Sequence, residues 1–153
     1  MEKLLYREAI LKDLPTLMRF EQLLIDSERP YDSCIKCTDV TYYDMNRLIS
    51  ESDTYVLVAE SGDRIVGSGY AQIRPSKKYQ THKAYCHIDF IYVEPNYRGK
   101  GVAQNIISKL QVWAGNHGID SFYLETYVEN EAAIRTCQKI GFKKLLVSME
   151  YFS

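Results

Sequence analysis

The chain has 153 residues, of which 46% are hydrophobic and 25% are charged, a composition typical of a globular domain with a substantial core. Nineteen Lys and Arg side chains nearly balance twenty Asp and Glu side chains, so the net charge of -1 gives no general attraction to nucleic acid or to anionic membranes. No apolar run approaches the roughly 18 residues of a membrane span, and the first residues lack a signal peptide's apolar stretch, so we expect one cytoplasmic domain over residues 1–153.

The first half of the chain predicts a short strand, two helices and a hairpin. The strand covers residues 4–7. Apolar residues recur at helical spacing over residues 13–25 and 41–50, which predicts the helices. Residues 55–60 and 65–73 have the composition of strands, and a polar, glycine-containing turn joins them, which indicates an antiparallel pair.

The second half alternates strands with helices. A long apolar strand is expected over residues 85–93, a helix over 101–114, a strand over 121–127, a helix over 130–140 and a last strand over 142–151. The strand, helix and strand between residues 85 and 127 should form a right-handed parallel crossover. The predicted fold is therefore α/β, with a mixed sheet of six to seven strands and about four helices distributed over both of its faces.

Four cysteines raise the question of a metal or redox site. Cys34 and Cys37 have the spacing of half a zinc site, and Cys86 with His87 could in principle complete it. Nothing repeats the paired spacing, however, and the Cys34–Cys37 segment lies in a polar loop rather than at a helix start after a strand, where redox pairs lie. We therefore expect reduced thiols and no metal.

A glycine-rich turn separates the long strand from the helix that follows it. It consists of Arg98, Gly99, Lys100, Gly101, Val102 and Ala103. The two glycines leave the backbone bare, so its N–H groups can approach an anion closely. A helix start adds unpaired N–H donors and the positive end of the helix dipole, and Arg98 and Lys100 add full charges. This arrangement predicts a phosphate site that suits a diphosphate best.

Two other phosphate motifs fit this chain less well. A Walker loop needs Ser or Thr after its lysine, and Gly101 follows Lys100 here. Gly67-Ser68-Gly69 lacks the third glycine of a dinucleotide fingerprint and lies inside a predicted strand. It therefore indicates close packing or a bulge.

Two blocks of the sequence resemble the GCN5-related N-acetyltransferases (GNAT). Arg-x-x-Gly-x-Ala at residues 98–103 resembles the signature of that family, and residues 91–97 resemble its fourth strand and the exit from it. Residues 130–134 and 139–142 are similar to its Asn-x-x-Ala helix and closing Gly-Phe. The resemblance covers roughly residues 85–142, and it implies the GNAT fold, acetyl-CoA as donor, and acyl transfer, but no particular substrate.

The resemblance also implies how individual residues contact the donor. Residues 98–103 would hold the pyrophosphate, and the backbone of the segment Ile91, Tyr92 and Val93 would pair with the pantetheine arm like an added strand. Asn130, with Ala133 on the same helix stripe, would bind the pantetheine. Lys139 would reach the nucleotide phosphate. A helix cap explains Asn130 equally well, and a solvated surface explains Lys139.

Acid–base chemistry is expected on the long strand and on the last helix. Asp89 is a charged residue inside an apolar strand, near where relatives often carry a glutamate, so it is a candidate general base. His87 lies two residues earlier, on the same side of a regular strand, and is the second candidate. Cys137 stands where many relatives have tyrosine, so it is either the general acid or a small core residue.

The sequence does not identify the amine that accepts the acyl group. Glu28, Asp32 and Asp39 lie in one polar segment and suit a cationic amine, whereas Lys77, Lys78 and Lys83 in another suit an acidic group. The expected activity is acetyl transfer to a primary amine of a small molecule or peptide by direct attack. A non-catalytic acetyl-CoA sensor and a transferase for another acyl-CoA remain alternatives. Whether the chain is a monomer or a homodimer also stays open.

Overall fold

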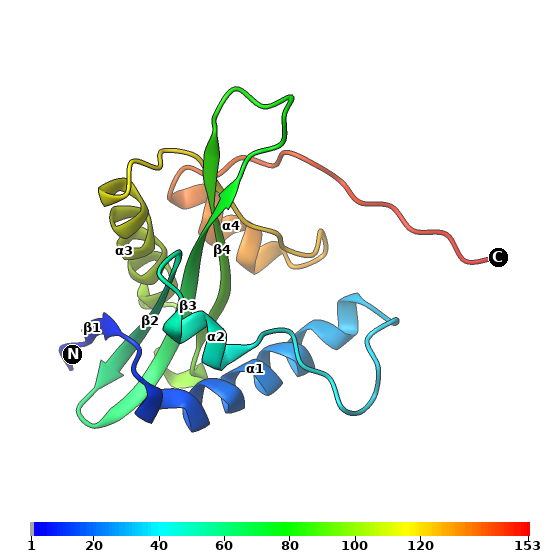
Figure 1. Cartoon of the computed structure of the whole chain (residues 1–153). Coiled ribbons are helices and arrows are strands. Elements are labelled where there is room, and N and C mark those ends of the chain that lie inside the picture. The colour runs from blue at the N-terminus through cyan, green and yellow to red at the C-terminus, as the bar shows by residue number, and fades with distance from the viewer. Residues whose placement is uncertain (1) are drawn as a thin grey trace.

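The computed structural model describes residues 2–153 and contains one five-stranded mixed sheet (Figure 1). Its elements are β1 (Leu5–Glu8), α1 (Leu14–Glu28), α2 (Met45–Ser50), β2 (Thr54–Ser61), β3 (Arg64–Pro75), β4 (Ala84–Val93), α3 (Val102–Asn116), β5 (Phe122–Tyr123) and α4 (Glu131–Lys139). The strands lie in the order β1-β2-β3-β4-β5; β4 and β5 are parallel and the other neighbours antiparallel, which confirms the predicted hairpin and crossover. Within the described residues no helix is long and apolar enough to cross a bilayer.

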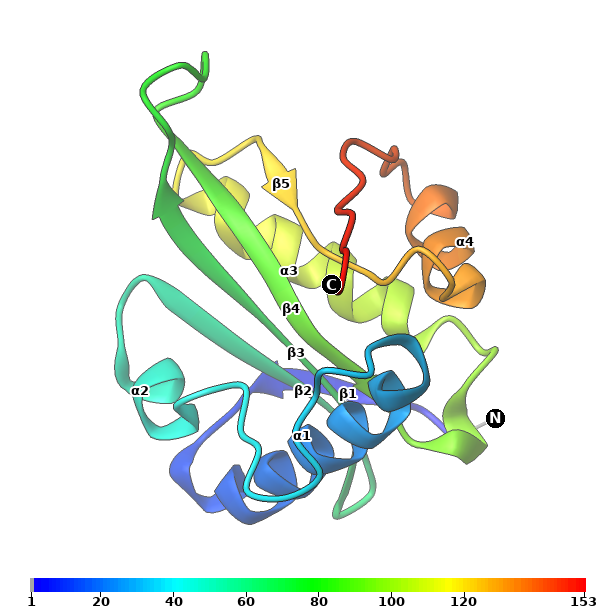
Figure 2. The same ribbon diagram turned by 90° about the vertical axis from the view of Figure 1, so that its right-hand side faces the viewer.

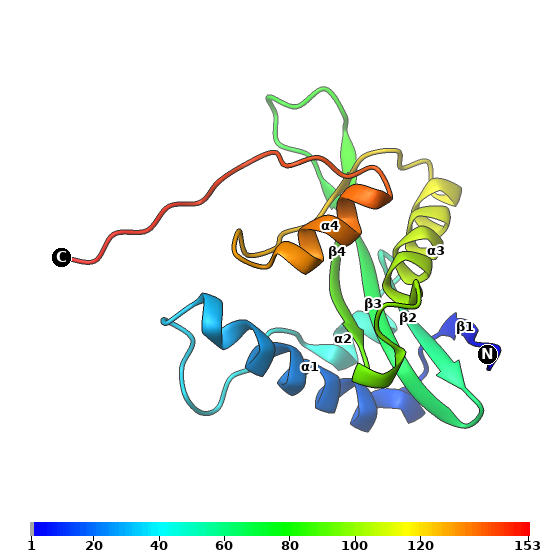
Figure 3. The same ribbon diagram turned by 180° about the vertical axis from the view of Figure 1, so that it is seen from behind.

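Helices cover both faces of the sheet, as the alternation of buried side chains requires. Val56 and Val58 pack with α1 and α2, whereas Leu57 and Ala59 pack with α3 on the opposite face. Figures 1 and 3 show α1 and α3 on opposite sides of the sheet, and Figure 2 shows α4 on the far side of β5 from β4.

Gly69 permits the close approach of α3 to the sheet. A Cβ atom at this position would lie 2.7 Å from Ile106 Cγ2 and 2.7 Å from Ile91 Cδ1, so both isoleucine side chains would have to move to admit it. The pairing of β3 with β4 also shifts register between Ser68 and Tyr70. Close packing is therefore confirmed for the Gly67-Ser68-Gly69 segment, whereas the extra residue of the bulge lies in the partner strand β4, opposite Gly69.

The predicted number of strands, six to seven, was too high, because five lie within residues 2–153. The expected last strand over residues 142–151 is extended but pairs with no strand of the sheet. The strand expected over residues 121–127 shortens to β5, and the helix expected over residues 41–50 begins only at Met45. The two shortened or unpaired strands have the right residue types, but a strand exists only where a neighbour accepts its hydrogen bonds. The helix begins at Met45 because the side chain of Asp44 accepts from the Arg47 N–H and caps it.

Candidate functional site

β4 and β5 separate after two residue pairs and leave part of β4 open. Cys86 pairs with Phe122 and His87 with Tyr123, and β5 ends there while β4 continues to Val93. Figure 2 shows the chain after β5 turning away toward α4 while β4 runs on toward α1. The β5 side of β4 beyond His87 thus offers backbone groups with no sheet partner in the described part of the chain.

A bulge in β4 lies at the start of this opening. Tyr70 pairs with Asp89 and Ser68 pairs with Tyr92, so two residues of β4 oppose Gly69 alone. One of these two, Phe90, has a φ of 59°, a left-handed conformation that is uncommon for a bulky side chain. The bulge bends the strand and changes the direction of the side chain that precedes it, Asp89.

Beyond the bulge, the backbone of β4 faces the opening at alternate residues. The N–H of Glu94 donates to Val66 O of β3 at 2.8 Å. Alternation along an antiparallel pair then places the N–H and C=O groups of Ile91 and Val93 on the opposite side, toward the opening. The carbonyl of Val93 accepts from Arg98 Nε at 2.7 Å, so the strand end is tied to the turn that follows.

The glycine-rich turn has the backbone conformation that a phosphate site requires. Gly99 and Gly101 have φ values of 73° and 81°, and Gly101 is the residue before α3. No side chain caps this helix end, so the N–H groups that every helix leaves unpaired in its first turn are available. Arg98 and Lys100 are exposed beside them. These features suit the diphosphate predicted from the sequence.

Asp89 is the centre of a hydrogen-bonded group in the opening. Its carboxylate accepts from the Tyr43 hydroxyl at 2.8 Å, from the Phe90 N–H at 2.7 Å and from His87 Nε2 at 3.3 Å. Burial raises the pKa of Asp89, but these donors outweigh it and hold the pKa below its usual value. The prediction that His87 and Asp89 lie on one side of the strand is confirmed.

Tyr43 is a part of this group that the sequence did not indicate. It lies in the extended segment before α2, and the buried carboxylate of Glu21 holds that segment by accepting the N–H groups of Tyr42 and Tyr43 at 2.9 and 2.7 Å. Burial, and then the charge of Asp89, raise the pKa of Tyr43 far above its usual value, so the hydroxyl stays protonated as a donor. No local sequence signal links residues so far apart in the chain.

Glu28 adds a second carboxylate to the same region. The helix predicted to end near residue 25 continues to Glu28, which is its last residue and is half-buried. Burial first, and then the charges of Asp89 and Asp32, raise the pKa of Glu28 to about 7. A carboxyl group with this pKa exchanges protons near neutral pH, which is the property of a general base.

Tyrosines connect the segments that border the opening. Tyr127, in the loop between β5 and α4, donates its hydroxyl to Asp32 Oδ2 at 2.9 Å and stacks on Tyr31 with ring centroids 5.9 Å apart. Asp32 thus joins the loop after α1 to the loop after β5. Carboxylates and tyrosines from three separate segments therefore meet beside the open strand.

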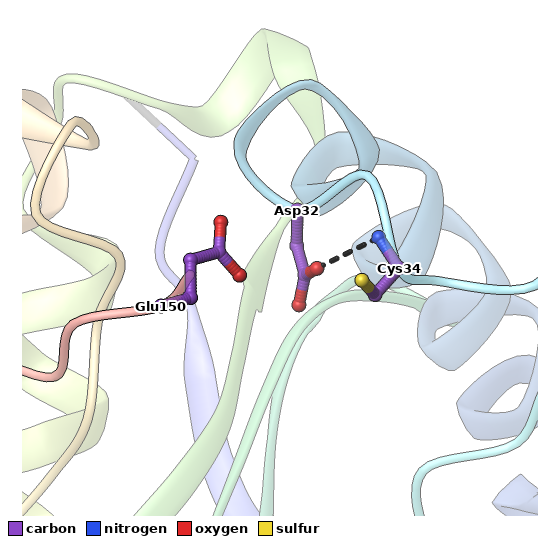
Figure 4. A group of neighbouring side chains, drawn as sticks. All are labelled: Asp32, Cys34 and Glu150. Atoms are coloured by element: carbon purple, nitrogen blue, oxygen red, sulfur yellow. Dashed lines mark hydrogen bonds between the residues drawn. The ribbon is translucent and has the colours of Figure 1, made fainter. Parts of the chain in front are cut away.

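One cluster has the composition of a metal site but not its chemistry. Figure 4 shows Asp32, Cys34 and Glu150, whose ligand atoms lie within 4.8 Å of one another. The two Asp32 oxygens already accept from the Cys34 N–H and the Tyr127 hydroxyl. The zinc set weighed from the sequence is not assembled within residues 2–153, where Cys86 is fully buried and belongs to no such cluster.

The residues of α4 and its cap that the sequence predicted to act in the site lie in different surroundings. Asn130 Oδ1 accepts from the Ala133 N–H at 3.2 Å, which confirms Asn130 as the helix cap. Cys137 is half-buried, and burial raises the pKa of its thiol. Lys139 is exposed in the last turn. Any role of these residues toward a cofactor stays a prediction.

A family model described as the acetyltransferase (GNAT) family matches residues 18–142. The chain belongs to the GNAT family. It is 26% identical over 145 residues to the uncharacterized protein ML0378 of Mycobacterium leprae, covering 92% of this chain and 34% of that protein. It is 26% identical over 110 residues to the N-alpha-acetyltransferase RimI of Mycobacterium tuberculosis, covering 70% of this chain and 63% of RimI. The GNAT chain thus spans less than two thirds of the length of both relatives.

Solved structures share the GNAT fold at low sequence identity. A predicted acetyltransferase with acetyl-CoA from Clostridium acetobutylicum has a TM-score of 0.79 at 20% identity, covering 98% of this chain and 96% of that one. The aminoglycoside antibiotic 6'-N-acetyltransferase AAC(6')-Ih from Acinetobacter baumannii has a TM-score of 0.73 at 17% identity, covering 99% of this chain and 98% of that one. This likeness confirms the fold implied by the sequence.

Proposed function

We propose that this GNAT chain is an N-acetyltransferase that moves the acetyl group of acetyl-CoA to the primary amine of a cationic substrate. The observation that carries the proposal is the continuity of three features at the end of β4. The open strand edge, the glycine-rich turn and the start of α3 follow one another along residues 88–103. Such a sequence of sites matches a ligand with an amide-containing arm that ends in a diphosphate.

The donor would lie with its diphosphate on the turn and its arm along β4. The first-turn N–H groups of α3 and the side chains of Arg98 and Lys100 supply positive charge to the diphosphate. The outward N–H and C=O groups of Ile91 and the N–H of Val93 can pair with the amides of the pantetheine arm, whereas the Val93 carbonyl already accepts from Arg98. The similar structure from Clostridium acetobutylicum contains acetyl-CoA, which supports this placement.

The transfer itself needs a neutral amine beside the thioester. A lysine-type amine has a pKa of about 10.4, so a base must remove a proton before or during attack. The amine nitrogen then bonds to the carbonyl carbon, the carbon–sulfur bond breaks, and the thiolate leaves as coenzyme A once it gains a proton. Glu28 suits the base better than Asp89, because the pKa of Glu28 is about 7 whereas three donors lower that of Asp89.

The charge around the opening indicates the class of acceptor. Burial, and then the negative charges of Asp89 and Asp32, raise the pKa of Glu28, so a cation beside these carboxylates would relieve the repulsion that Glu28 experiences from the other two. The lysines of the β3–β4 connection lie on a hairpin tip that projects away from α1 in Figure 1. We therefore expect an acceptor with more than one positive charge, and the aminoglycoside acetyltransferase among the similar structures fits this class.

The decisive experiment is a panel of acceptors with detection of the free thiol. Diamines, polyamines, aminoglycosides and peptides with basic N-termini are compared with neutral and acidic amines at equal concentration. We expect thiol release, with kcat/KM highest for the polycations. If the protein binds coenzyme A but releases no thiol with any amine, the transferase proposal is wrong and the protein is an acetyl-CoA sensor. A preference for acidic amines would contradict the proposed cationic acceptor.

Cys137 is expected to contribute little as a general acid. Burial raises the pKa of its thiol, which weakens it as a proton donor to the leaving thiolate. Cys137→Ala should therefore lower kcat by less than about threefold, since general acid catalysis typically contributes a hundredfold or more. Thr136→Ala, on the neighbouring helix position, is the control for loss of packing. A hundredfold loss in Cys137→Ala alone would assign the thiol to proton transfer.

The organisation of the chain agrees with this proposal. All four cysteines are free, which fits the reducing conditions of the cytoplasm, where we expect the protein. We also propose that residues 1–153 form one catalytic domain, because both hydrophobic cores pack on the same sheet.

A further inference from the structure

The connection between β3 and β4, residues 76–83, carries a positive charge for which the proposed site has no use. Lys77, Lys78 and Lys83 lie in it, and the chain has no Asp or Glu between residues 64 and 88. The whole chain has a net charge of -1, so the rest of the chain is net negative. The connection is therefore a local cation on an acidic protein, and its charge favours an acidic surface as partner.

The tip of this connection, residues 77–80, is an ordered turn that presents a lysine. The Gln80 N–H donates to Lys77 O at 2.9 Å, and the Lys77 N–H donates back to Gln80 Oε1 at 2.9 Å. Lys78 and Tyr79 are thus the two central residues of a β-turn. The Nζ of Lys77 lies 5.8 Å from the centroid of the Tyr79 ring, whereas Lys78 is exposed. Lys78 is therefore the amine that the turn presents to another molecule.

The base of the connection is fixed in a way that keeps the tip away from its own site. His82 contacts the hydroxyl groups of Ser76 and Tyr123, with its Nε2 2.8 Å from the Tyr123 oxygen, and so ties the connection to β5. Asp89 and Ala84, the first residue of β4, are separated by about 16 Å of extended strand. Figures 1 and 2 show the connection projecting beyond the sheet. The tip therefore points toward a second molecule rather than toward the opening of its own chain.

The opening between β4 and β5 matches this tip in charge and in side-chain type. Three carboxylates lie beside the opening, and the stacked rings of Tyr31 and Tyr127 lie at its border. The tip offers cations from Lys77 and Lys78, and the Tyr79 ring beside them is 80% exposed. Cations suit the carboxylates, and an exposed ring suits the bordering tyrosines. The tip of one copy thus has the chemistry of an acceptor for the opening of another.

We propose that Lys78 is a modification site that a second copy of this chain acetylates, an inference that rests on the proposed transferase function. The Lys78 ammonium loses one proton to the base, and its nitrogen then bonds to the carbonyl carbon of acetyl-CoA. The carbon–sulfur bond breaks, and a second proton from the nitrogen converts the thiolate to the thiol of coenzyme A. Acetylation removes the positive charge of Lys78, so the modified tip loses its attraction to the acidic opening.

The first experiment tests whether one copy modifies another. A size-tagged Gly101→Val chain, impaired in donor binding, is incubated with isotope-labelled acetyl-CoA and an untagged Lys77→Arg/Lys78→Arg chain, and the tagged chain is mapped by mass spectrometry. We expect label on its Lys78 only when the partner is present, at a rate proportional to the partner concentration. Equal labelling without the partner would indicate chemical acetylation. Labelling of the wild type alone, but not of the tagged chain, would indicate transfer within one copy. Either result would overturn the proposal.

The second experiment tests the choice of lysine in the wild type. Lys143 and Lys144 are the internal control, because they are also adjacent and exposed but lie in no turn. We expect Lys78 to gain label about tenfold faster than either of them, since complementary charge raises the rate of encounter. Lys78→Arg should remove this label and leave thiol release with polyamines unchanged. Equal labelling of the three lysines would contradict the proposal.

A polyamine reaction in the same preparation separates failure of this inference from failure of the proposed function. If polyamines give thiol release while Lys78 stays unlabelled, the transferase proposal stands and the acetylation of Lys78 is wrong. If neither polyamines nor Lys78 accept the acetyl group, both proposals are wrong.

Discussion

Gly101→Val should weaken coenzyme A binding by about a hundredfold, because loss of two hydrogen bonds to a charged diphosphate costs about 3 kcal/mol. Gly101 has a φ of 81°, in the left-handed region that a β-branched residue avoids. The valine would turn the backbone N–H groups of the first helical turn away from the anion. Isothermal titration calorimetry with coenzyme A measures the effect directly.

Gly118→Val is the matched control for this substitution. Gly118 lies beyond the other end of α3, has a φ of 77°, and like Gly101 has no atom within 4 Å of an added Cβ. Both variants should therefore lose similar stability, about 1–2 kcal/mol each for a left-handed residue. Only Gly101→Val should lose affinity. Equal affinities in the two variants would remove the turn from the diphosphate site.

Glu28→Gln should lower kcat by about a hundredfold at neutral pH, the usual contribution of a general base. In the wild type, kcat/KM should rise with pH through about 7, the pKa at which Glu28 loses its proton, and then level off. Asp26→Asn, on the exposed face of the same helix, is the control and should keep both the rate and the profile. Wild-type turnover in Glu28→Gln would exclude Glu28 as the base.

The Asp89→Asn variant distinguishes whether Glu28 or Asp89 is the general base. The charge of Asp89 helps to raise the pKa of Glu28, so its removal should move the rise in kcat/KM to lower pH while much of the rate remains. If Asp89 is itself the base, its substitution should instead lower the rate about a hundredfold at every pH. The two variants thus assign the proton transfer to one residue.

The same pKa shift predicts a change in stability that does not depend on activity. The folded-state pKa of Glu28 lies near 7, above the ordinary 4.5, so the folded protein binds more protons than the unfolded chain between these values. The free energy of unfolding therefore falls as pH rises through this range. Glu28→Gln should be more stable than the wild type by about 1–3 kcal/mol at pH 8 and equal to it near pH 4. Urea unfolding at the two pH values measures this difference.

The features that could be predicted from the sequence alone are those that depend on residues close together in the chain. The positions of α3, α4 and the long strands β2, β3 and β4 follow from residue periodicity, and the turn over residues 98–103 follows from glycines and charges adjacent in the chain. The cap at Asn130 is equally local, since its partner Ala133 is three residues away. These features need only neighbouring residues, so they can be read without the rest of the fold.

Only the tertiary structure decided the features that depend on distant segments. The bulge at Phe90 and the separation of β4 from β5 arise from pairing with other strands, which no local pattern reports. Tyr43 reaches Asp89 because Glu21 holds its backbone, and the pKa of Glu28, at the end of α1, depends in part on Asp89 of β4. Residues 143–153 have the composition of a strand, but a strand forms only where a neighbouring edge accepts its hydrogen bonds, and within residues 2–153 no strand of the sheet pairs with them.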